Sequence, residues 1–157
     1  MFLEEKIERI KKHFPQADFR VPFTEGGDIL KKMEARFVIS AKPAYQHTNW
    51  SEGLKERVIL RAIDRKGIGK ALSLLDTNSN YWVVVVVGDG SMAQPFVFDC
   101  KPIAMEQLIA IAPGDFFIGD KKYAWLVYFA VDRAENAVTL IKAGNFPTPF
   151  DHLPQPR

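Results

Sequence analysis

Three histidines and a single cysteine are the side chains best suited to bind a metal or attack a substrate. His13, His47 and His152 lie far apart in the sequence, and none has a second ligand at the spacing typical of metal sites. Cys100 follows Asp99 at the end of an expected strand, and no neighbouring residue supplies the base that a nucleophilic thiolate needs. We therefore expect surface or tail histidines, a buried cysteine, no metal and no cofactor.

Two glycine-containing segments invite comparison with phosphate-binding loops. Residues 66–70, Lys-Gly-Ile-Gly-Lys, lack the glycine spacing and the Lys-Ser/Thr ending of a P-loop, and residues 88–91 are interpreted as a turn. A helix that begins behind residues 66–70 could still hold an anion through its free N–H groups. The carboxylates Asp115 and Asp120 are interpreted as exposed turn residues. The sequence leaves enzymatic activity open and favours a protein without it.

The composition is that of an ordinary folded domain. The chain has 157 residues, of which 47% are hydrophobic and 25% are charged, enough to bury a core without disulfides. The net charge of +2, without a long Lys or Arg run, argues against nucleic acid as a partner. The single cysteine favours a reducing compartment, and the longest apolar run, residues 81–87, is too short to span a membrane. Because the N-terminus also lacks a signal-peptide pattern, we predict a cytoplasmic protein without a membrane partner.

The hydrophobic pattern switches between the helical and the strand period along the chain. Residues 2–14 place Leu3 and Ile7 on one stripe of a helix that should pack on the domain as a lid or flank. Residues 57–63 fit a helix or a strand, and their β-branched content favours the strand. The remaining expected elements are helices at 28–35, 68–75 and 103–111, strands at 37–39, 81–87, 96–98, 116–118, 123–131 and 137–141, and connections at 16–27 and 43–49.

The run Tyr81–Val87 indicates the centre of a sheet. Its five consecutive valines put apolar side chains on both faces of the strand, so both faces must be covered. The last three strands, joined by turns at 119–122 and 132–136, should form an antiparallel meander. We predict an α+β fold with a single mixed, mostly antiparallel sheet and helices packed against it.

No linker divides the chain. Residues 1–144 are predicted to form a single α+β domain. Residues 145–157 contain four prolines and should be a tail without regular structure, either pinned to the sheet by Phe146 and Phe150 or frayed.

The hairpin sequence at residues 116–126, Phe-Phe-Ile-Gly-Asp-Lys-Lys-Tyr-Ala-Trp-Leu, resembles a pattern of small bacterial proteins of unassigned function. In that pattern an aromatic strand, a Lys-Lys-Tyr-x-Trp-Leu hairpin and a further strand end an α+β domain. Across residues 81–143 the layout is similar to that of the SUKH superfamily. The resemblance implies an immunity protein that neutralises a toxin, and it carries no catalytic residue over to this chain.

The same hairpin and the loop around Trp50 supply the candidate binding residues. Strand alternation directs Tyr123 and Trp125 to one face; a bare opposite face would be a partner site, and helical cover is the favoured interpretation. Since the valine strand should be structural, we expect binding to involve residues outside it. These residues are Trp50, Asp120, Lys122, Tyr123 and Trp125.

Two functions fit these expectations. The first is a non-catalytic protein-binding module, an immunity or adaptor protein whose partner is another protein such as a toxin. The alternative is a small-molecule-binding protein or enzyme with a pocket between the sheet and the N-terminal helices. That pocket would be lined by Arg61, Asp99, Lys122 and Tyr123. The sequence leaves the oligomeric state open.

Overall fold

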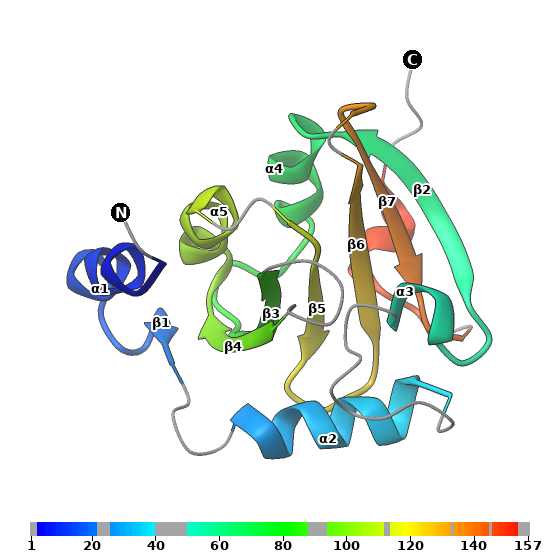
Figure 1. Cartoon of the computed structure of the whole chain (residues 1–157), viewed down its shortest axis with the longest axis horizontal. Coiled ribbons are helices and arrows are strands. Elements are labelled where there is room, and N and C mark those ends of the chain that lie inside the picture. Colours follow the sequence, from blue (N-terminus) through cyan, green and yellow to red (C-terminus); the bar gives the residue numbers. More distant parts are fainter. Residues whose placement is uncertain are drawn as a thin grey trace.

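The chain folds around one antiparallel sheet, seen in Figure 1. This computed structural model describes residues 3–21, 26–39, 50–87, 94–111, 114–132, 134–144 and 146–153. Within them seven strands pair in the order β1-β4-β3-β5-β6-β7-β2, and every pairing is antiparallel. The strands are β1 (Phe19–Arg20), β2 (Val58–Asp64), β3 (Tyr81–Val87), β4 (Gln94–Cys100), β5 (Phe116–Asp120), β6 (Leu126–Asp132) and β7 (Ala137–Lys142).

Helices cover both faces of the sheet (Figure 1). They are α1 (Leu3–His13), α2 (Gly26–Phe37), α3 (Trp50–Gly53), α4 (Gly67–Leu72) and α5 (Pro102–Ile111). One core joins α1, α4 and α5 to the face that carries Val83 and Val85. The other core joins α2 and α3 to the face that carries Trp82 and Val84. The predicted α+β fold, with an interior valine strand covered on both sides and a meander of β5, β6 and β7, is confirmed.

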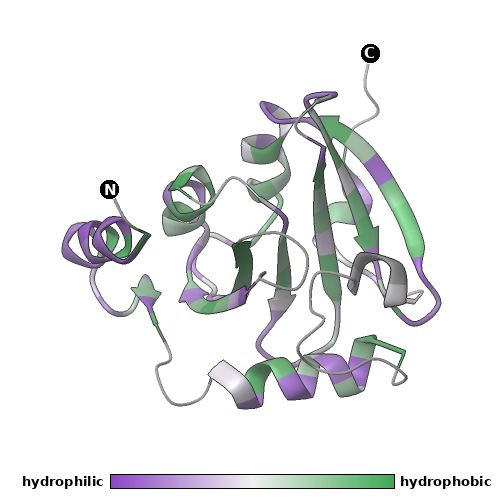
Figure 2. Cartoon of the chain, viewed as in Figure 1, coloured by the Kyte–Doolittle hydropathy of each residue, from purple (hydrophilic) through white to green (hydrophobic). Residues whose placement is uncertain are grey.

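Hydrophobic residues concentrate in the inner strands and in α5, whereas α1 and α2 alternate hydrophobic and polar residues (Figure 2). This is the pattern expected of interior strands between helices that each bury one face. None of the described helices combines the length and the apolar character needed to cross a membrane.

The structure corrects two of the expected elements and confirms the favoured interpretation of a third. The chain at 37–39 is not a strand, because α2 continues to Phe37 and only Val38 forms a single bridge, with Leu54. The expected connection at 16–27 contains the short strand β1, which extends the sheet beyond β4. The ambiguous residues 57–63 do form a strand, β2, at the opposite edge.

The last strand of the aromatic hairpin begins later than expected, at Leu126 instead of Tyr123. Tyr123 has a φ of 56°, a left-handed conformation that cannot continue a strand. The Asp120 carboxylate accepts the backbone N–H of Ala124 at 2.6 Å and fixes this turn. Residues 121–125 are therefore a structured loop between β5 and β6.

The C-terminal segment includes a short 3-10 helix, Pro149–His152, where no regular structure was expected. Phe150 is 1% exposed, so it pins the segment to the sheet, whereas Phe146 remains 37% exposed. The Lys142 ammonium adds an ion pair with Asp151 at 3.0 Å. The expected loops at 43–49 and 88–91 lie outside the described residues, as does His47.

Candidate functional site

Some of the hairpin residues predicted to bind a partner form hydrogen bonds that stabilise the hairpin itself. The Asp120 carboxylate accepts N–H groups of the loop, from Ala124 at 2.6 Å and from Trp125 at 3.4 Å. Lys122 is exposed at the tip. The structure therefore ties the Asp120 carboxylate to the hairpin backbone and leaves Lys122 exposed to solvent.

Tyr123 connects the hairpin to α2. The Arg36 guanidinium donates to the Tyr123 carbonyl at 3.1 Å, and the Lys32 ammonium lies 5.9 Å from the tyrosine ring centroid. Burial raises the pKa of the Tyr123 hydroxyl, and the Trp82 indole partly opposes this rise. The indole N–H is itself buried and forms no full hydrogen bond with any described residue.

The two predicted tryptophans lie in different cores. Trp50 is 3% exposed and packs against Phe117, with ring centroids 4.8 Å apart, on the α2 side of the sheet. Trp125 is 7% exposed and packs against Tyr81 and Phe150 on the α5 side. Both side chains thus contribute to packing, and the structure does not bring them together with Lys122 and Tyr123 on one surface.

A charged cluster surrounds Asp99 near the end of β4. Its carboxylate receives Lys121 at 2.7 Å, Asn80 at 2.8 Å and Arg20 at 3.4 Å. The Lys121 ammonium also lies 3.5 Å from the centroid of the Trp82 ring. Each charge in this cluster has a counter-charge within the described residues, which is the pattern of a structural network.

The polar residues proposed to line a small-molecule pocket do not converge. Arg61 lies on β2 and Asp99 on β4, and β3, β5, β6 and β7 separate these strands in the sheet. Cys100 is buried, as predicted, and its pKa is raised well above the ordinary value, mainly by burial and further by the Asp99 charge. Its thiol is therefore protonated at neutral pH and is a poor nucleophile. The described residues contain no group of three or more potential metal ligands.

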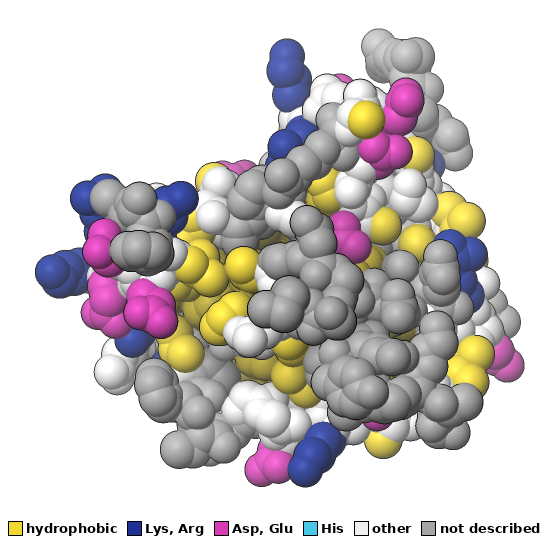
Figure 3. All heavy atoms as spheres, in the orientation of Figure 1, with side chains coloured by type: hydrophobic (Ala, Val, Ile, Leu, Met, Phe, Trp, Pro, Cys, Tyr) yellow, Lys and Arg dark blue, Asp and Glu magenta, His cyan; other side chains and the backbone are white. Residues whose placement is uncertain are grey.

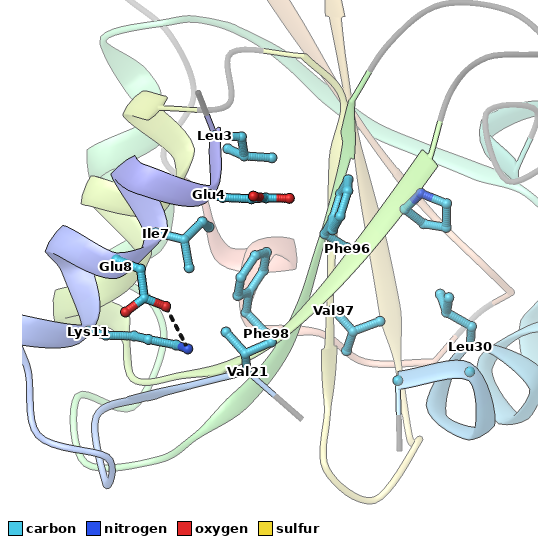
Figure 4. A pocket seen from close by; sticks show the side chains of 13 residues that line it. Leu3, Glu4, Ile7, Glu8, Lys11, Val21, Leu30, Phe96, Val97 and Phe98 are labelled. Atoms are coloured by element: carbon cyan, nitrogen blue, oxygen red, sulfur yellow. Dashed lines mark hydrogen bonds and ion pairs between the residues drawn. The ribbon is translucent and has the colours of Figure 1, made fainter. Parts of the chain in front are cut away.

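An apolar groove of about 680 Å³ lies at the β4 side of the molecule (Figure 3). Hydrophobic side chains gather there beside α1, and Figure 4 shows β4 as the floor between α1 and the start of α2. The lining residues are Leu3, Glu4, Ile7, Glu8 and Lys11 from α1, Val21 after β1, Gly26, Gly27 and Leu30 from α2, and Pro95, Phe96, Val97 and Phe98 from β4.

The groove presents exposed aromatic surface with charges only along one rim. Phe96 is 38% exposed although it belongs to a strand. Lys11 pairs with Glu8 at 3.1 Å on the rim. Glu4 extends from α1 toward Phe96 in Figure 4 and forms no ion pair within the described residues. The groove therefore offers apolar contact together with one uncompensated negative charge.

Comparison of the chain with models of protein families, with curated proteins and with solved structures gave no significant match. The functional assignment consequently rests on the geometry of the described residues.

The groove residues were not among the predicted binding residues, although two sequence signals point to them. Pro95 lies within a β-forming run, and proline in a sheet marks an edge strand. Gly26 and Gly27 look like simple breakers in the sequence, yet they begin α2 and leave the groove wall bare of side chains. The distance in sequence between these signals hides the fact that they share one site.

Proposed function

We propose that this chain is a non-catalytic protein-binding module and that the apolar groove beside β4 is its recognition surface. The observation that carries the proposal is the exposed aromatic floor at Phe96, flanked by walls from two helices. Interface centres are rich in aromatic residues and poor in charge, with polar residues at the rim. The groove has this arrangement, with Glu4, Glu8 and Lys11 along the rim.

The chemistry of the lining favours binding over catalysis. Among the described lining residues there is no serine, threonine, cysteine, histidine or tyrosine, and the side chains that could act as nucleophiles are Glu4, Glu8 and Lys11 at the rim, of which Glu8 and Lys11 form an ion pair. The single thiol of the chain, that of Cys100, is protonated and belongs to the core that includes α5. The groove therefore offers an apolar surface of defined shape, which suits binding.

The finer proposal is that the partner is a toxin and the chain an immunity or adaptor protein. It is supported by the resemblance of residues 81–143 to the layout of SUKH proteins. Growth of a host that expresses each protein encoded beside this gene provides the test, because a toxin among them would arrest growth. Co-expression of the chain should restore growth, and a Phe96→Asp variant should fail to restore it. Equal rescue by both proteins would contradict the use of the groove.

Site-specific photo-crosslinking tests the binding role of the groove directly. A benzoylphenylalanine replaces Phe96, and in separate control proteins it replaces Ile103 or Ile59, which are 65% and 56% exposed outside the groove. Irradiation of host cells should give a discrete protein adduct from position 96 and little from the two controls. Adducts of equal yield at all three positions, or none at position 96, would overturn the proposal.

A second candidate function is the binding of an apolar small molecule in the same groove. The volume of about 680 Å³ falls within the roughly 300–1,000 Å³ of typical ligand pockets. Native mass spectrometry of the chain purified from its host would then show a retained small mass that Phe96→Asp abolishes. A retained mass, with no protein adduct from position 96, would favour this candidate over the first.

A further inference from the structure

We propose that the groove accepts an extended segment of a partner protein, which adds to the sheet as a strand beside β4. The segment carries apolar side chains on both of its faces and a basic residue opposite Glu4. This inference rests on the proposed protein-binding function and specifies the form and chemistry of the partner.

The direction of backbone groups along β4 follows from a hydrogen bond of its neighbour β3. Val86 donates its N–H to the carbonyl of Asp115, which precedes β5, at 2.9 Å. Backbone groups alternate sides along a strand, so the even-numbered residues of β3 face β5 and the odd-numbered ones face β4. The β4 residues opposite Val83 and Val85, which are Phe98 and Phe96, therefore bond to β3.

The intervening residues of β4 direct their backbone groups away from β3. These residues are Pro95, Val97 and Asp99. The short strand β1 pairs with Asp99 and Cys100, and no other described segment pairs with the outer edge of β4. With respect to the described residues, the outer edge thus leaves the N–H and C=O of Val97 and the C=O of Pro95 without a backbone partner. Pro95 fits this place because its missing N–H would point outward and costs the ladder no bond.

These groups, which pair with no described segment, lie within the groove. Pro95, Val97 and their neighbours form its floor, and Val97 is only 7% exposed. Backbone donors and acceptors in a partly dry site gain from a partner that satisfies them, and an extended peptide supplies alternating N–H and C=O groups at the same spacing. The edge therefore selects for extended backbone more than for any particular side chain.

The walls of the groove favour a single segment over the edge of another folded sheet. In Figure 4 the α1 ribbon stands on one side of β4 and the start of α2 on the other. Gly27 would place a Cβ in open space, with no atom within 4 Å, and a Cβ on Gly26 would approach Val97 no closer than 3.8 Å. Two bare residues on the α2 wall leave room for a backbone, whereas the helices on both sides obstruct a second domain.

The two sides of the floor determine the side chains of the segment. Phe96 and Phe98 lie on the α1 side of β4, and Val97 lies on the α2 side near Leu30 (Figure 4). Alternate side chains of an added strand would face these two apolar surfaces in turn. Glu4 lies at the mouth on the α1 side without a described counter-charge, and a lysine or arginine of the segment would compensate it.

The test uses short random peptides displayed on phage and selected on the immobilised full chain. The selected peptides should be enriched in apolar residues and should carry a Lys or Arg. A synthetic peptide of the selected sequence is then measured by fluorescence anisotropy. Methylation of single peptide nitrogens, which removes one N–H and keeps the side chain, should weaken binding by about tenfold at alternate positions only.

Variants of the chain provide matched controls. Val97→Pro removes the outward N–H and should weaken binding of the peptide by about tenfold, whereas Val97→Ala keeps that N–H and should weaken binding less. Glu4→Gln should weaken it modestly and in a salt-dependent manner. Thermal unfolding of each variant verifies the fold. The methylated peptides test the same backbone hydrogen bonds without any change to the chain.

The outcomes separate this inference from the proposed function. If Phe96→Asp abolishes binding while methylated peptides and Val97→Pro bind normally, the groove binds proteins through side chains and the strand inference is overturned. If Phe96→Asp has no effect on the selected peptides, or if no peptide is selected, the strand inference falls, and crosslinking from position 96 then decides whether the groove binds proteins at all. Self-association of the chain that excludes the peptide would show a second copy as the occupant and would also overturn the inference.

Discussion

The Phe150 ring stands edge-on to the Phe129 ring, with centroids 5.3 Å apart and planes at 85°. Phe129 belongs to β6 in the middle of the sheet, whereas Phe150 comes from the proline-rich C-terminal segment. Edge-to-face aromatic packing stabilises the fold beyond the contribution from burying the two rings. The C-terminal segment is therefore part of the hydrophobic core at this point.

Phe150→Ala should destabilise the protein strongly because the ring is 1% exposed and its removal leaves a cavity. The expected loss is about 3–5 kcal/mol in the free energy of unfolding, measured by urea denaturation. Phe146→Ala is the control, since its ring is 37% exposed and its loss should cost less than about 1 kcal/mol. Equal effects of the two substitutions would show that the segment is not anchored by Phe150.

Asp99→Asn should destabilise the fold by about 1–3 kcal/mol, because two cations would lose their shared carboxylate. The substitution keeps the size of the side chain and its contact with Asn80. Glu8→Gln provides the comparison, since it removes an exposed pair with Lys11 and should change stability by less than about 0.5 kcal/mol. Urea denaturation of the two variants measures both values, and an unchanged Asp99→Asn protein would contradict a structural role for the cluster.

The Cys100 thiol should make the protein less stable in mild alkali. Burial keeps the folded-state pKa of this thiol well above its ordinary value, whereas in the unfolded chain it titrates near about 8.5. Above that pH the unfolded chain loses a proton that the folded chain retains, so unfolding becomes more favourable by up to about 1.4 kcal/mol per pH unit.

Urea denaturation between about pH 7 and 9.5 checks this expectation. Cys100→Ala should lower the stability at neutral pH, because it trims a buried side chain, and should flatten the decline above about pH 8.5. Parallel pH profiles for the two proteins would show that the thiol is not held protonated by the fold.

The sequence predicts the parts of the fold that depend on local pattern. The valines at 83–87 admit one arrangement, an interior strand, and β3 spans the predicted residues. The predicted start of β6 is wrong because it depends on a side chain that precedes the strand, the Asp120 carboxylate, which accepts the N–H of Ala124. The strand at 37–39 was wrong because the packing of Met33 and Phe37 against the sheet extends α2 past its local signals.

The candidate site was harder to predict because it lies at the edge of a strand, and the order of the strands in the sheet decides which edges are exposed. Phe96 lies in a strand as predicted, but its 38% exposure goes with a strand edge on which, among the described residues, β1 pairs only with the last two residues of β4. Trp50 was predicted to be a binding residue in a loop, yet it packs against Phe117 in the core on the α2 side of the sheet. Neither fact is visible before the order of the strands is known.

Hydrogen exchange of the β4 amides, followed by NMR on the protein without a bound partner, measures whether the outer edge of this strand is open. The N–H groups of Phe96 and Phe98 face β3 and should be strongly protected. The Val97 N–H faces the groove and should exchange faster than both, by on the order of a hundredfold. Equal protection of all three amides would mean that the edge is already paired, and the groove would then have no backbone to offer a partner.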